Sequence, residues 1–324
     1  MNLLTEITMT ASGLGTKSIN FLKSNKVSKS PTVELDIKDE FYHFQGRLRT
    51  DKIFTVILSL ATYSLVLVLV GLIGSIFYLG WEYLTPNLFE NFSSRFPSKA
   101  GLKGGLYGTM MLVGLTIAIV VPLSISTAIY IEEILKPGRI RKFLLLNLNN
   151  LSGVPSIVFG IVGLSIFVQY LGFGRSVLSG ALTLSLLALP IITVSAIEAF
   201  RVVPKSIRDA AYSLGANKLQ VVFYHVLPNS IPTIMTGTIL AISRIVGETA
   251  PLIVVGAVAY VAFTPEGVFD DYSALPIQIF NWLSRPNVEF HHLAAAGIIV
   301  LLAILLTFNS VAVCIRNKYQ KKLG

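Results

Sequence analysis

Long uninterrupted apolar runs are the feature that most limits what this chain can fold into. A helix crosses the roughly 30 Å core of a bilayer with about 20 consecutive apolar residues, and six stretches of the sequence reach that length. Hydrophobic residues make up 53% of the 324 residues and charged residues 13%, against roughly 25% charged residues in ordinary soluble domains. The sequence therefore predicts an all-α integral membrane protein. The six expected spans are 53–80, 105–131, 144–171, 176–199, 229–262 and 293–315.

The fifth of these spans is too long for one straight crossing. It also contains Arg244, Glu248 and Pro251, so we expect tilt or a break there. The remaining organisation follows from composition. It comprises a polar, partly disordered extension (1–50), a membrane domain (51–318) with one long loop (200–228), and a basic tail (319–324).

The distribution of Lys and Arg predicts the orientation of the chain. The N-terminal segment, the loops 132–143 and 200–228, and the C-terminal tail together hold 20 of the 26 basic residues. The loops on the opposite side hold five, and Arg244 lies inside a span. Basic residues concentrate in cytoplasmic loops, so both termini are expected in the cytoplasm. The same distribution explains the net charge of +9 without any nucleic-acid partner.

Few residues of the kinds used in metal or nucleophilic chemistry are present. Cys314 is the single cysteine, which excludes an internal disulfide framework and a multi-cysteine metal site. The four histidines are scattered or merely adjacent. The sequence thus predicts no metal site, no catalytic residue and no cofactor bound by this chain.

The loop 200–228 has the pattern of a helical hairpin. Pro204 suits the first turn of a helix, and Gly215 suits a left-handed cap at its end. Asn217 can then cap a second short helix, which we expect to end before Pro228.

One face of the first helix in this hairpin is apolar, and Arg208 and Asp209 lie beside it. Such a ridge fits either a groove in a partner protein or the bilayer surface, and the pattern alone does not separate the two. The ridge residues recur at helical spacing: Ile207, Ala210, Ala211 and Leu214.

The same loop resembles the EAA motif of ABC importer permeases. The matching residues are Asp209, Ala210, Ala211, Gly215, Leu227 and Pro228, at the spacing of that motif. Asp209 replaces the usual Glu, and His225 stands where an aliphatic residue is usual, so Val226 is expected to supply the apolar contact. The resemblance implies that this loop docks on an ATPase subunit. The residues assigned to coupling are these six together with Arg208.

Further segments resemble the A-type (PstA) subunits of phosphate-specific ABC importers, over about residues 50–318. The resemblance implies a type I importer permease fold in the inner membrane of a bacterium. It also implies a C-type permease partner, a dimeric ATPase that hydrolyses ATP with Mg, and a periplasmic phosphate-binding protein docking on loops 81–104 and 263–292. The matching segments are 103–109, 153–160, 247–251, 276–280 and 309–312.

Arg244 and Glu248 are four residues apart, so they share one helix face. A charge near the middle of the bilayer costs at least about 2.5–3.5 kcal/mol and is kept when it faces a cavity or a partner. We expect Arg244 to contact an oxyanion and Glu248 to hold Arg244, although a structural ion pair is the alternative. Gly247 and Thr249 complete the expected substrate pathway.

The segment that holds Gly153, Pro155 and Ser156 breaks the third span, where its small residues permit close packing or form a gate. Glu198 is expected to pair with Arg201 or Arg208 or to remain in water. Other functions stay open: a permease for molybdate or sulfate, the C-type subunit, a passive channel or proton-coupled carrier, and a membrane sensor.

Overall fold

The computed structural model describes residues 31–257 and 260–323, and every regular element in them is helical. The chain divides into two units, Met1–Gly71 and Leu72–Gly324. Helix α2 begins at Pro31, so residues 1–30 of the expected polar extension lie outside the described part, while 31–50 are helical.

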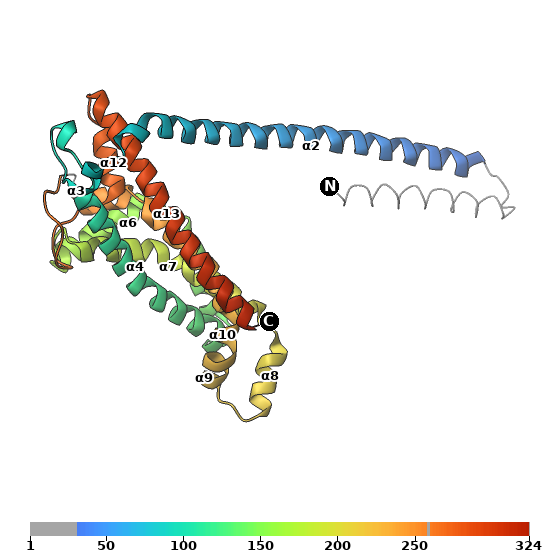
Figure 1. The fold of residues 1–324 in the computed structure, drawn as a ribbon. Coiled ribbons are helices and arrows are strands. Elements are labelled where there is room, and N and C mark those ends of the chain that lie inside the picture. The colour runs from blue at the N-terminus through green and yellow to red at the C-terminus, as the bar shows by residue number, and fades with distance from the viewer. Residues whose placement is uncertain (1–30, 258–259, 324) are drawn as a thin grey trace. The chain divides into compact units, whose positions relative to one another are not determined.

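The elements of the second unit surround a central helix, α7 (Val177–Val202), which packs against α4, α10, α6 and α5 (Figure 1). Two-thirds of the most apolar stretch of α7, 67%, is buried inside the chain, the highest share among the five unbroken candidate spans of the described residues. The α-helical bounds are α2 Pro31–Gly80, α3 Pro86–Glu90, α4 Lys103–Ile129, α5 Arg139–Ser152, α6 Ser156–Gly163, α7 Val177–Val202, α8 Lys205–Ser213, α9 Lys218–Val221, α10 Leu227–Gly247, α11 Ala250–Val255, α12 Leu275–Leu283 and α13 Val288–Leu323.

Small residues and hydroxyl groups let α7 lie at the centre of an apolar bundle. The hydroxyls of Thr183 and Ser185 donate to the carbonyl oxygens of Ser179 and Ala181, both at 2.7 Å, so no buried hydroxyl is left unbonded at these two positions. On α4, a Cβ at Gly108 would lie 2.0 Å from the carbonyl oxygen of Ser273, so the glycine allows the segment before α12 to pack closely on this helix.

Five helical stretches of the described residues are long and apolar enough to cross a membrane, and a sixth crossing is obtained if one bent pair counts as a span. That pair is α5 with α6 and its π-helical continuation η4 (Leu164–Tyr170), and the bend between the two parts is 102°. The break falls where the sequence predicts it. Pro155 disfavours helical geometry at Val154, so α5 ends at Ser152 and α6 begins at Ser156.

The second helix of the hairpin does not end before Pro228, contrary to the prediction. It continues from α9 through the π-helical turn η5 (Val222–Val226) into α10, giving one apolar stretch, Lys218–Gly247. A π turn widens the helix at the point where proline lacks its N–H and its ring would meet a carbonyl of the preceding turn. Pro228 therefore lies in the first turn of α10 without interrupting the path of the chain.

The two ends of the bundle carry different short elements. The hairpin of α8 and α9 lies at one end, which we call the hairpin end, and α3 and α12 lie at the other, which we call the α3 end (Figure 1). At the hairpin end, one apolar cluster includes Ile131 of the π turn η3 (Tyr130–Ile134), Phe200 of α7 and Ala211 of α8. This cluster fixes α8 against the ends of two long helices.

Candidate functional site

Arg244 and Glu248 form an ion pair at the break between α10 and α11. The Nε atom of Arg244 lies 3.3 Å from Oε1 of Glu248. The side chain of Arg244 is 46% exposed in the isolated chain and that of Glu248 is 14% exposed. The arginine therefore lies on the surface of the bundle, with part of its guanidinium open to a partner or a ligand.

The break expected in the fifth span is confirmed beside this pair. Helix α10 ends at Gly247, and Glu248 is extended, with φ −71° and ψ 128°. Helix α11 then starts with Pro251 in its first turn and ends at Val255, before Gly256, whose φ of +98° is left-handed. Non-helical backbone at such a depth is tolerated where it lies against protein or lines a water-filled cavity. The hydroxyl of Thr249 bonds weakly back to the Gly247 carbonyl, at 3.4 Å.

The expected gate segment leads directly into a helix that packs on α11. Helix α6, which begins at Ser156, contacts α11 closely. Gly153 and Pro155 are exposed, and a Cβ at Gly153 would meet nothing nearer than 3.5 Å. The close approach is instead at Gly160, where a Cβ would lie 2.7 Å from Cα of Pro251.

Gly160 was not among the residues predicted for the site. In the sequence, Gly160 is recognisable only as a glycine one turn after Ser156, at the end of the matched segment 153–160 and on an otherwise apolar helix. A glycine in that setting is compatible with ordinary packing, and the contact that gives it importance joins segments about ninety residues apart.

The coupling hairpin has the local geometry that its sequence predicts at both turns. Helix α8 follows Pro204, and Gly215 has φ +85°, a left-handed conformation that favours glycine. The side chain of Asn217 accepts from the Gln220 amide at 2.9 Å, and the Gln220 side chain accepts from the Asn217 amide at 2.8 Å. These reciprocal bonds form a capping box that starts α9.

The apolar ridge of α8 is not presented to solvent as one face, contrary to the prediction. Ala211 is 4% exposed and Ile207 packs beside it against the chain's own core. Leu214, in contrast, is 89% exposed, and Asp209 and Ala210 are also exposed. The inner side of the helix holds it in place, and the outer side together with its tip remains available.

The other matched positions of the motif lie inside the chain. Val226 is fully buried and His225 is exposed, so the apolar contact has moved by one residue, as expected. Leu227 packs on the same cluster, and Pro228 is half-buried at the start of α10.

Arg208 also acts inside the chain. Its guanidinium bonds to Glu133 and to two carbonyl oxygens at the end of α7. Of the two alternatives for Glu198, the exposed carboxylate holds, because Glu198 is exposed, Arg201 binds Glu132 and Arg208 binds Glu133. Sequence reasoning missed both acidic partners, which are about seventy residues away in the chain.

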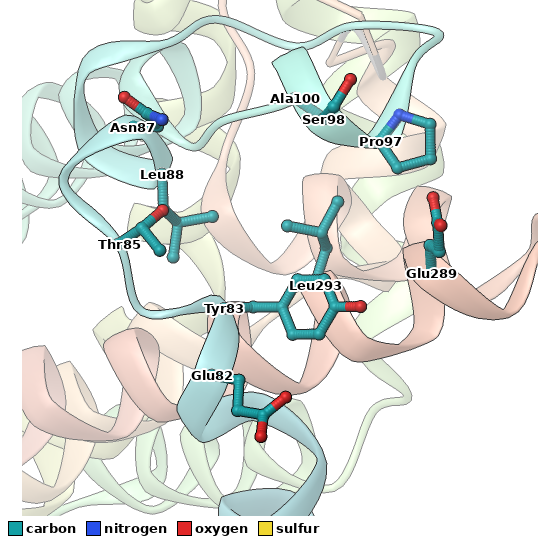
Figure 2. A pocket seen from close by; sticks show the side chains of 10 residues that line it. All are labelled: Glu82, Tyr83, Thr85, Asn87, Leu88, Pro97, Ser98, Ala100, Glu289 and Leu293. Carbon is teal, nitrogen blue, oxygen red and sulfur yellow. The ribbon is translucent and has the colours of Figure 1, made fainter.

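At the α3 end, segments from both sides of the sequence meet. Arg285 donates to the Ser94 carbonyl at 3.2 Å and lies over the ring of Phe290, 4.3 Å from its centroid. A cavity of about 330 Å³ lies at this end. Figure 2 shows Glu82 and Glu289 at it, with Tyr83 and Leu293 between them.

In the parts of the chain that the structure describes, no three His, Cys, Asp or Glu residues come together as metal ligands. The partly exposed guanidinium of Arg244 at the helix break is suited to binding an anion, and the exposed apolar side chain of Leu214 at the hairpin end is suited to contacting a protein.

Curated relatives resemble most of the chain. The chain is 33% identical over 253 residues to "Phosphate transport system permease protein PstA 1" of Mycobacterium tuberculosis, covering 76% of this chain and 82% of that protein. It is 30% identical to "Probable phosphate transport system permease protein PstA" of Methanocaldococcus jannaschii, covering 82% and 92%. It is 28% identical to "Probable ABC transporter permease protein YqgI" of Bacillus subtilis, covering 86% and 99%.

Solved structures share the fold at low sequence identity. A chain of a bacterial ABC transporter for alginate matches with a TM-score of 0.57 and 14% identity, covering 89% of this chain and 99% of that one. A chain of the MetNI methionine ABC transporter, in an inward-facing conformation, matches with a TM-score of 0.53 and 15% identity, covering 67% and 95%. The fold is that of a type I ABC importer permease.

A family model described as "Binding-protein-dependent transport system inner membrane component" matches residues 121–322, which include the coupling hairpin and the Arg244 break. Together with the relatives above 30% identity, this match shows that the chain belongs to the family of binding-protein-dependent inner membrane transport components.

Proposed function

We propose that this chain is one permease subunit of an ATP-driven importer of inorganic phosphate and forms half of its translocation pathway. The observation that carries the proposal is the partly exposed Arg244, paired with Glu248 at the break between α10 and α11. The choice of phosphate is supported by the relatives named as phosphate permeases.

The chemistry of the pair suits a phosphate ion. A guanidinium presents several N–H groups in a planar fork that matches two oxyanion oxygens at once. Glu248 holds the arginine and keeps the empty site near neutral. Its carboxylate can also accept a hydrogen bond from a protonated phosphate oxygen, which fully deprotonated sulfate does not offer. Gly247 and Thr249, on either side of Glu248 at the break, complete the proposed substrate pathway.

The hairpin end faces the cytoplasm in this proposal, together with both termini, because 20 of the 26 Lys and Arg residues belong to that side. There α8 docks on an ATPase dimer, which binds and hydrolyses ATP with Mg. This chain binds no cofactor and has no catalytic residue of its own. Leu214, at the exposed tip of the hairpin, is the apolar anchor of the docking surface.

The opposite end accepts a periplasmic phosphate-binding protein in the proposal. Loops 81–104 and 263–292 form this end, and Arg285 joins them. A second, C-type permease subunit covers the face that carries Arg244 and completes the pathway. ATP binding then moves the hairpin and shifts the permease pair between outward-open and inward-open states.

The test is uptake of labelled phosphate into lipid vesicles that contain the assembled complex, with ATP inside and loaded binding protein outside. Arg244→Gln is compared with wild type and with Arg139→Gln, which removes an exposed guanidinium at the start of α5, outside the proposed pathway. We expect uptake to fall at least about tenfold in Arg244→Gln, because one charge-assisted contact contributes about 1.5–3 kcal/mol, while the complex still assembles.

Unchanged uptake in Arg244→Gln would make Arg244 a structural charge. Absence of phosphate uptake by wild type, with uptake of molybdate or sulfate through its own binding protein, would assign the chain to another oxyanion. Transport that persists after ATP depletion at a clamped membrane potential would contradict the ATP-driven mechanism.

A further inference from the structure

Two adjacent carboxylates at the end of α4 collect arginines from later parts of the chain. Glu132 and Glu133 both lie in the π turn η3. Glu132 accepts from Arg201 at 3.1 Å and pairs with a second arginine, and Glu133 accepts from a third at 2.7 Å. We call this group the carboxylate cluster. Its arginines come from α5, α7 and α8 in turn: Arg141, Arg201 and Arg208.

Arg208 links three helices through one guanidinium. Its Nη2 atom lies 2.7 Å from Oε1 of Glu133 and 2.8 Å from the Phe200 carbonyl oxygen, and its Nη1 atom lies 2.7 Å from the Val203 carbonyl oxygen. The last carbonyls of a helix lack partners within the helix, and the planar fork of arginine suits several acceptors held at fixed positions. The α8 helix is therefore fixed to the ends of α4 and α7.

Burial shows that these bonds do not compete with contacts to a partner. The side chain of Arg208 is 18% exposed and that of Glu133 is 11% exposed. Beside them, Ala211 of α8 belongs to the same apolar cluster as Ile131 of the η3 turn, and Ile207 packs against that cluster. The ion pair and the apolar packing thus both hold the inner side of α8, and the tip of the hairpin remains exposed.

The second helix of the hairpin is fixed to the same place. The Nζ atom of Lys218 donates to the Ile134 carbonyl oxygen at 3.2 Å, at the end of η3. The only left-handed residue of the hairpin, Gly215, lies between the two attachments and makes the turn. Both arms of the hairpin are therefore held to the end of α4.

We propose that Glu133 and Arg208 are positioning residues that make α8 move as one rigid body with the ends of α4 and α7. Displacement of the hairpin by an ATPase then reaches these two helices through the pair, in addition to the chain connections. Arg208 transmits the motion inside this chain and does not form the ATPase contact. The inference rests on the proposed function in one respect, that α8 is the surface on which the ATPase acts.

The direct test is a distance measurement in the complete complex reconstituted in lipid. Spin labels are placed on cysteines at Lys136 and Tyr212, both exposed, in a Cys314→Ser background. We expect the distance between the two labels to be the same with and without ATP. The distance from the label at Tyr212 to a label at the corresponding position of the partner permease should change with ATP. In Glu133→Gln, the Lys136–Tyr212 distance should broaden and become dependent on nucleotide.

A functional measurement separates coupling from folding. We expect Glu133→Gln to lower the phosphate transported per ATP hydrolysed about fivefold or more, with the ATPase still bound and hydrolysing. Arg208→Lys, which keeps the charge and loses the fork, should lie between wild type and Arg208→Gln. The double variant Glu133→Gln/Arg208→Gln should be no worse than Arg208→Gln alone. Lys142→Gln, an exposed basic neighbour outside the cluster, is the matched control.

A Lys136–Tyr212 distance that changes with nucleotide in the otherwise wild-type protein would overturn the proposal. This measurement does not depend on the variants, so it tests the proposal even if a variant fails to assemble. Equal coupling ratios in wild type and Glu133→Gln would also overturn it. If wild type imports no phosphate but the distance stays fixed through the ATP cycle, the assignment of substrate fails and the rigid-body coupling stands.

Discussion

Gly160 and Pro251 approach so closely that a Cβ added to the glycine would lie 2.7 Å from Cα of the proline and 2.9 Å from its carbonyl oxygen. The obstacle is backbone, which cannot turn aside as a side chain can. The contact joins α6, just after the sharp bend of the third span, to α11, just after the Arg244 break. The two irregular places of the bundle are thereby held together.

Gly160→Ala is therefore expected to lower stability by about 1–3 kcal/mol through overpacking and to reduce transport. Gly114→Ala adds the same methyl group to α4, where nothing lies within 4 Å, and should be neutral or slightly stabilising. Thermal unfolding of the purified protein, followed by uptake in vesicles, gives both values. Equal melting temperatures for the two variants would contradict the close contact.

Glu248→Gln is expected to change transport much more than stability. The Arg244 side chain is 46% exposed, and ion pairs with an exposed partner contribute about 0–1 kcal/mol. The melting temperature should thus stay close to that of wild type, while phosphate uptake falls. Glu198→Gln, an exposed carboxylate on α7, should affect neither. A large loss of stability in Glu248→Gln would support the structural ion pair instead of the pathway.

Asn309→Ala tests the contact between α10 and α13. The hydroxyl of Ser243 lies 2.6 Å from Oδ1 of Asn309 and 2.8 Å from the Ile239 carbonyl oxygen. A hydroxyl has one proton, so loss of the amide leaves Ser243 with an acceptor in its own helix. We expect a cost of about 0.6 kcal/mol, as for hydrogen bonds between membrane helices generally. Thr307→Ala, whose hydroxyl bonds within α13, is the control, and denaturant unfolding measures both.

The loop that ends at Asp270 should loosen in acid. The Asp270 carboxylate accepts from the Gly267 amide at 2.8 Å and from the Glu266 amide at 2.9 Å, and these bonds lower the pKa of its carboxyl group below the ordinary value. Because the pKa of Asp270 is lower in the folded state than in the unfolded state, its ionised carboxylate stabilises the loop at any pH above the unfolded pKa. This stabilisation is lost as the pH falls through the folded pKa, when the carboxylate is protonated.

Hydrogen exchange measures this effect at the two amides. After correction for the intrinsic rate, the Glu266 and Gly267 amides should lose protection as pH falls below about 4. Asp270→Asn should lack this pH dependence, because its amide oxygen does not titrate in that range. Protection that stays constant down to the lowest pH at which the protein is folded would show that the bonds do not hold the loop.

The sequence by itself determined the elements with strong local causes. Apolar length predicted the five long helices that can cross a membrane, Pro155 predicted the break in the third expected span, and Gly215 and Asn217 predicted the two turns of the hairpin. In each case the cause acts within a few residues, through a fixed φ, a missing N–H or a side chain that caps its own helix. The motif of the hairpin indicated the family for a similar reason, because its residues lie in one continuous stretch of the sequence.

The tertiary structure alone decided which faces point inward and which charges meet. Periodicity placed Ala211 and Leu214 on one ridge, but Ala211 is buried in the apolar cluster at the hairpin end and Leu214 is exposed. Arg208 binds Glu133 because the ends of two helices happen to meet there, and nothing near either residue in the sequence encodes that meeting. Long-range contacts depend on how whole helices pack, so a local pattern can fix a turn but cannot choose its partner.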